Sequence, residues 1–152
     1  MKIAWIYLDK RGAAANALKD YVNMDFIIRN HPDNVMESRA RMTAVHSSTF
    51  TEAPHHPDPF AAESYLASAI DEIDVLQERY RRALEYMQWF QPAWEALTED
   101  ERFVLGEFYR GTDDGQVDAI ANIRDRFHIE RSSAYRKKER ALARLATLLY
   151  GK

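Results

Sequence analysis

The chain of 152 residues carries 21 basic and 24 acidic side chains, a formal net charge of -3, and no cysteine. The length suits about one domain, or one domain with a small addition. Its 46% apolar and 30% charged residues are typical of a globular protein and exclude wholesale disorder. The lack of cysteine excludes disulfides, thiolate metal sites and cysteine nucleophiles.

The low number of glycine and proline residues favours helices. Five glycines and five prolines are few for a turn-rich β architecture. No apolar run approaches the roughly 20 residues that cross a bilayer, so we expect no membrane segment. The first residues lead directly into Ile3-Ala4-Trp5 without a long apolar leader, so we expect no secretory signal and a cytoplasmic location.

The first 30 residues are predicted to be helical, because strong helix formers gather between Ala13 and Leu18. The segment from Asn30 to Asn34 predicts a turn, and Pro32 within it is suited to open a short helix that reaches Arg41. Residues 43–59 contain two serines followed by a threonine and, near their end, three prolines within six residues. Because no helix tolerates that density of proline, we expect residues 43–59 to form a mobile loop.

The strongest periodicity in the chain predicts a long helix over residues 60–91. Apolar residues step alternately by four and three positions for four heptads. Such a helix needs a partner along its length: either the N-terminal helix folds back on it, or a second copy forms a homodimer through residues 62–90. Pro92 is expected to end or kink the helix.

This heptad seam consists of Ala62, Leu66, Ala69, Ile73, Leu76, Tyr80, Ala83, Met87 and Phe90. Four neighbouring apolar residues widen it, so we expect the helix to pack against more than one partner. They are Tyr65, Ile70, Leu84 and Tyr86.

Three shorter helices are predicted over residues 97–152. Thr98 and Glu101 have the spacing of a capping box that opens the first of them. The second spans residues 116–127 and the third residues 131–150, so that only three residues join them. That short connection is typical of a helix-turn-helix unit, whose second helix enters the major groove of DNA.

The charge distribution favours a polyanion partner at this end of the chain. Residues 116–152 carry nine basic and four acidic side chains, whereas residues 1–115 carry 12 basic and 20 acidic ones. Arginine is suited to guanine edges, and serine and tyrosine hydroxyls are suited to phosphates or bases. We therefore predict that DNA is contacted by Arg131, Ser132, Ser133, Tyr135, Arg136, Lys137 and Arg140.

Four short motifs resemble region 4 of sigma-70-type factors, which contains a helix-turn-helix. They are Leu97-Thr98-Glu99, Ile120-Ala121, Phe127-His128-Ile129 and Arg140-Ala141-Leu142. The run from Ser132 to Lys138 is closer still to small phage transcriptional regulators of the ArpU/RinA type. This resemblance implies regulation of phage or prophage genes, with DNA contacts in the first turns of the helix over residues 131–150. Lys137 departs from the sigma pattern, because sigma factors place an apolar core residue there, and the chain lacks a promoter-melting region.

Other candidate sites are weaker. The four histidines His31, His46, His55 and His56 lack the fixed spacing of a zinc site. The acids Asp71, Glu72, Asp74 and Glu78 lie close to arginines, as on an ion-paired helix surface. No nucleotide-binding, metalloprotease or nucleophile motif is present, so we expect neither enzymatic activity nor a cofactor or metal.

The sequence thus predicts an all-α protein in two parts. Residues 1–96 form N-terminal helices with the loop at 43–59 and the long heptad helix at 60–91, and residues 97–152 form a three-helix helix-turn-helix domain. The expected function is sequence-specific binding of double-stranded DNA that regulates transcription, with RNA polymerase as a further partner. The alternative is a protein-interaction module, a coiled-coil adaptor or anti-activator, that does not bind DNA.

Overall fold

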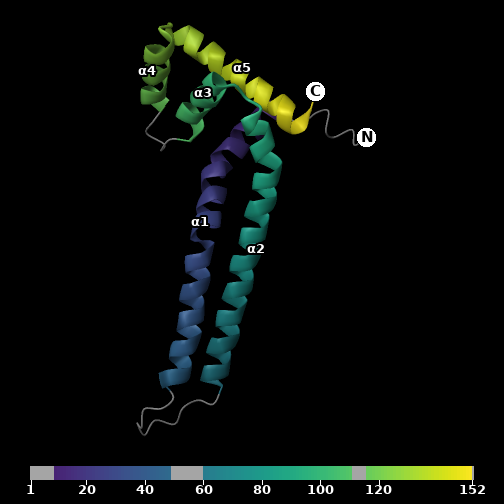
Figure 1. Cartoon of the computed structure of the whole chain (residues 1–152), viewed down its shortest axis with the longest axis vertical. Coiled ribbons are helices and arrows are strands. Elements are labelled where there is room, and N and C mark those ends of the chain that lie inside the picture. The colour runs from purple at the N-terminus through teal and green to yellow at the C-terminus, as the bar shows by residue number, and fades with distance from the viewer. Residues whose placement is uncertain (1–8, 49–59, 111–115, 152) are drawn as a thin grey trace. The chain divides into compact units, whose positions relative to one another are not determined.

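The computed structural model describes residues 9–48, 60–110 and 116–151. They form five helices: α1 (Lys10–Ser48), α2 (Ala61–Glu95), α3 (Glu99–Tyr109), α4 (Gln116–Phe127) and α5 (Arg131–Tyr150). Figure 1 shows these helices in chain order. No strand occurs in the three described ranges, so the all-α prediction is confirmed.

The chain divides into two compact units. The terminal unit consists of Met1–Met24 and Tyr86–Lys152, and the hairpin unit consists of Asp25–Glu85. The helices α1 and α2 each contribute to both units. The boundary predicted between residues 96 and 97 lies within the terminal unit, because Leu97 shares a buried cluster with Ala14 and Leu145.

In the hairpin unit, residues 25–48 of α1 run beside residues 61–85 of α2 (Figure 1). The α2 side uses the predicted seam: Ala69 and Ala83 are buried, and Leu76 and Tyr80 are half-buried. Of the two expected partners, a folded-back helix or a second chain, this unit contains the first. The facing residues of α1 also step by three and four positions: Ile28, His31, Val35, Ser38 and Met42.

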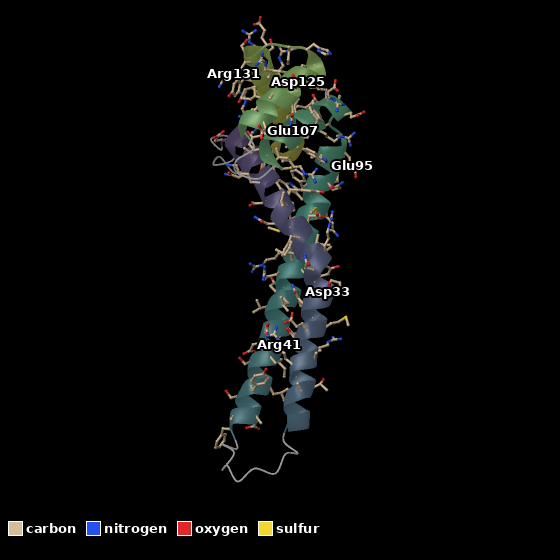
Figure 2. The ribbon with its side chains drawn as sticks, turned by 90° about the vertical axis from the view of Figure 1, so that its left-hand side faces the viewer. Asp33, Arg41, Glu95, Glu107, Asp125 and Arg131 are labelled. Carbon is tan, nitrogen blue, oxygen red and sulfur yellow. The ribbon has the colours of Figure 1, made fainter. Side chains whose placement is uncertain are left out.

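Contacts across the hairpin unit explain why α1 is longer than predicted. The turn expected at residues 30–34 is absent, and α1 continues through Pro32 to Ser48. Proline in a helix costs about 3 kcal/mol, but His31 stacks on Tyr80 and Arg41 reaches Glu72. Figure 2 labels Arg41 on α1. Packing between helices therefore overrides the local preference for a turn.

The loop predicted at residues 43–59 is wrong for its first six residues, which continue α1. The prolines that motivated it all lie later, and residues 49–59 are outside the described part of the chain. The helix α2 continues beyond Pro92 and ends at Glu95. Tyr65, Ile70 and Leu84, which were expected to widen its seam, are exposed in the hairpin unit.

The terminal unit has a main core that joins both ends of the chain. It contains residues from the start of α1, the end of α2, α3 and the second half of α5. The Tyr86 hydroxyl donates a hydrogen bond to the Ala17 carbonyl, and burial raises the pKa of Tyr86. The largest buried members include Leu18, Phe90, Trp94, Leu105 and Leu145.

A second, smaller core holds α3, α4 and the start of α5 together. Val104, Ile123 and Ala134 are buried, one from each helix. Aromatic rings close its edges, with Phe103 and Phe127 in edge-to-face contact at 6.1 Å between centroids. Each of these three helices therefore contacts the other two.

The start of α3 and the end of α5 lie where the sequence predicted them. The Glu101 amide donates to Thr98 Oγ1 at 3.3 Å, and the Thr98 amide donates to Glu101 Oε2 at 2.9 Å, which confirms the capping box. Gly151 closes α5 with a φ of 76°, and its amide donates to the Thr147 carbonyl. The left-handed backbone at this position suits glycine.

Candidate nucleic-acid interface

Three residues connect α4 to α5, as predicted. His128 adopts a left-handed backbone with a φ of 52°, which is unusual for a residue with a side chain. The Ile129 amide donates to the Arg124 carbonyl at 3.3 Å and thereby closes the last turn of α4. This tight connection sets where α5 begins. Figure 2 labels Asp125 and Arg131 at the end of the terminal unit where the two helices meet.

The first turn of α5 has backbone donors without a side-chain cap. Glu130 occupies the cap position, but its carboxylate makes no capping hydrogen bond. The first amides of a helix lack partners within the helix, and the helix dipole adds positive potential there. The adjoining Arg131 and Ser132 are exposed, so the start of α5 is an electropositive, accessible surface.

The outer face of α5 is the side opposite its buried residues. Ala134, Ala141 and Leu145 are buried, and at about 100° per residue Ser132, Arg136 and Arg140 project on the opposite side. All three are exposed. We call these three residues the outer ridge. Arg136 and Arg140 make no hydrogen bond or ion pair with any residue in the described ranges, so both guanidinium groups are available to a ligand.

Two other residues that the sequence predicts to contact DNA, Arg131 and Tyr135, flank the outer ridge. The guanidinium carbon of Arg131 lies 5.9 Å from the ring centroid of Tyr135. The Tyr135 ring is 38% exposed and lies 6.1 Å from the Phe108 ring. Packing against Phe108 orients the tyrosine while leaving it accessible. Ser133, the next predicted contact, is half-buried.

The lysines of α5 are less available than the arginines. Lys137 Nζ lies 4.4 Å from the Phe127 ring centroid, and the residue is half-buried. Lys138 Nζ lies 4.9 Å from the centroid of Phe108. A lysine stem can cover apolar surface while its ammonium group rests on an aromatic face. Lys137 therefore packs against an aromatic ring from α4.

Two arginines that the sequence placed in the basic cluster bind the acids at the start of α3. Arg126 Nη2 lies 3.5 Å from Glu99 Oε1, and its guanidinium group lies over the Phe103 ring. Arg144 Nη1 lies 3.4 Å from Glu101 Oε1. These ion pairs connect α4 and α5 to α3. Sequence patterns could not assign this role, because the partners lie 27 and 43 positions away.

A pocket of about 220 Å³ lies between the start of α3 and the middle of α5. Asp100 and Glu101 line one side, and Lys137 and Arg140 line the other. The acids lower the positive potential on this side of the outer ridge. Arg131 and Arg136 do not line this pocket, so the first two turns of α5 are best suited to a polyanion.

The other sites weighed from the sequence have no counterpart in the described residues. No group of three histidines or acids there is placed to hold a metal ion. His31 stacks on Tyr80, while the side chains of His46, His55 and His56 lie outside the described part of the chain. Glu78, one of the four acids, is paired with Arg81 and Arg82. No helix in the described ranges is long and apolar enough to cross a membrane.

Comparison with known proteins gives no relative: no family model, no curated protein and no solved structure matches the chain.

Proposed function

We propose that this chain is a sequence-specific regulator of transcription that binds double-stranded DNA through α5. The observation that carries the proposal is the outer ridge, Ser132, Arg136 and Arg140, which is exposed on a helix fixed by two cores. In this proposal α4 and α5 act as a helix-turn-helix, with α5 as the helix that enters the major groove.

The outer ridge has the chemistry that base recognition requires. Arg136 can donate two hydrogen bonds to the O6 and N7 atoms of guanine, and Ser132 can reach a neighbouring base or phosphate. Arg131, Tyr135 and Arg140 are suited to phosphates on either side of the groove. The uncapped start of α5 adds backbone donors for one phosphate. In this proposal Lys137 contributes less to DNA binding, because its ammonium group lies over the Phe127 ring.

The biological setting proposed here comes from the resemblance to small phage regulators. The protein acts in the cytoplasm on phage or prophage genes and contacts RNA polymerase through the acidic part of the chain. Residues 1–115 have eight more acidic than basic side chains, which leaves α5 as the region suited to DNA.

A selection experiment tests this function. Duplexes bound by the full chain are enriched from a random library, and binding to the enriched duplex is followed by gel retardation. The variant Arg131→Ala/Arg136→Ala should lose the retarded band while circular dichroism remains unchanged. The charge-matched control Arg39→Ala/Arg79→Ala, in the hairpin unit, should retain it.

The alternative, a protein-interaction module, makes a different prediction. Such a module would enrich no duplex and would show no salt-dependent DNA binding. If Arg131→Ala/Arg136→Ala binds the enriched duplex as well as the unmodified chain, the assignment of α5 as the reading helix is wrong.

A further inference from the structure

The single acidic residue of α5, Glu139, borders the outer ridge. At about 100° per residue it lies about 60° around the helix from Arg136, and its side chain is 52% exposed. An uncompensated carboxylate at this place would repel the phosphates of a DNA strand on the outer ridge. Two cations lie against it: Lys138 Nζ at 4.0 Å and Arg11 Nη1 at 3.8 Å.

Arg11 comes from the opposite end of the chain. The first turns of α1 are fixed beside α5 because Ala14 and Leu18 share the main core with Leu142 and Leu145. Lys10 Nζ also donates to the Gly151 carbonyl at 3.1 Å. The Arg11 side chain nevertheless remains 62% exposed, so its guanidinium group has donors directed to solvent.

We propose that Arg11 belongs to the DNA-binding surface and contacts a DNA backbone phosphate next to the phosphates that α5 binds. This inference rests on the proposed function. Glu139 holds the guanidinium group at the border of the outer ridge, and the remaining donors of Arg11 bind the phosphate. A guanidinium group has five N–H donors in a planar fork, so it can serve a carboxylate and a phosphate together.

The salt dependence of DNA binding tests the proposal. The probe is a fluorescent duplex of 30 base pairs and mixed sequence, and its affinity for the full chain is measured by anisotropy over a range of salt concentrations. Arg11→Ala should reduce the slope of log K against log salt by about one, the value for one lost phosphate contact. The control Lys19→Ala, which removes an exposed cation from the same helix, should leave the slope unchanged.

A second background separates direct contact from simple neutralisation of Glu139. In Glu139→Gln the amide oxygen can still accept a hydrogen bond from Arg11 without a negative charge, so a further Arg11→Ala change should still reduce the slope by about one. If the effect of Arg11→Ala disappears in that background, Arg11 only compensates Glu139 and the proposed phosphate contact is wrong. An unchanged slope for Arg11→Ala in the otherwise unmodified chain also overturns it. If the unmodified chain binds no duplex, the proposed function itself fails.

Discussion

The imidazole ring of His31 lies parallel to the phenol ring of Tyr80, with 4.1 Å between centroids and 7° between planes. His31 directly precedes Pro32, where the sequence predicted a turn. The stacked pair joins α1 to α2 at that point, so the helix that the proline weakens is supported from its neighbour. This contact is the physical reason why α1 continues where the sequence predicted a turn.

Removing one ring of this pair should destabilise the hairpin unit. We expect His31→Ala to lower the free energy of unfolding by about 1 kcal/mol, which is typical of a lost aromatic contact. Urea denaturation followed by circular dichroism measures the change. Asp33→Ala, an exposed substitution two residues away, is the control and should have little effect. Equal stability of His31→Ala and the unmodified chain would show that the stacking does not support α1.

Ser38 offers a stabilising substitution. It is 1% exposed, and its hydroxyl has no hydrogen-bond partner among the described residues. A buried hydroxyl without a partner costs roughly 1–3 kcal/mol of desolvation. We therefore expect Ser38→Ala to raise the free energy of unfolding by about 1 kcal/mol. Ser68→Ala, at an exposed position on α2, should leave it unchanged. A loss of stability in Ser38→Ala would contradict the prediction.

Glu78 should make the stability of the hairpin unit depend on pH. Hydrogen bonds from Arg81 and Arg82 lower the pKa of Glu78 from 4.5 to about 2. The unfolded chain therefore takes up this proton at a higher pH than the folded chain does. The stabilisation from Glu78 is present above pH 4.5 and is lost as the pH falls towards 2.

This pH dependence is measured by thermal unfolding in that pH range. We expect the melting temperature of Glu78→Gln to fall less steeply with acidification than that of the unmodified chain. Glu63→Gln changes an exposed glutamate at the start of the same helix and serves as the control. Parallel curves for Glu78→Gln and the unmodified chain would be inconsistent with a stabilising role for the ion pairs of Glu78.

The turn between α4 and α5 should gain stability from glycine. The backbone of His128 is left-handed, and a side chain there costs about 1 kcal/mol that glycine avoids. We expect His128→Gly to raise the free energy of unfolding by about this amount, as measured by urea denaturation. His128→Ala, with the same backbone demand but a short side chain, separates this effect from the loss of the imidazole. If alanine stabilises as much as glycine, backbone strain is not the cause.

The helical elements were predictable where the sequence has a regular apolar period. The heptad steps of α2, the capping box at Thr98 and the short connection before Arg131 were confirmed, because each depends on residues close together in the chain. The helix predicted to reach Arg41 is present, but the continuity of α1 through Pro32 and its extension to Ser48 were missed, although the inward residues there also follow heptad spacing. His31 and Ser38 are polar and Pro32 lies between seam positions, so only the contacts with α2 reveal this face.

The candidate interface was predictable only as a cluster of basic residues. The sequence could not separate the exposed arginines of the outer ridge from Lys137 and Lys138, which lie against aromatic rings from α3 and α4. It also gave no indication that Arg11 lies against Glu139, because that contact depends on the main core. To predict the interface, one would need to know how buried each basic residue is and which residue of another helix it contacts.

The hydrogen bond from Lys10 to Gly151 joins positions 141 residues apart, and the main core beneath it has the same long reach. A nascent chain cannot complete this core until α5 has left the ribosome. Until then, the apolar residues at the start of α1 and the end of α2 lack their partners on α5. Premature termination within α5 would leave Leu18 and Trp94 without their cover, and such products are expected to require chaperones or to be degraded.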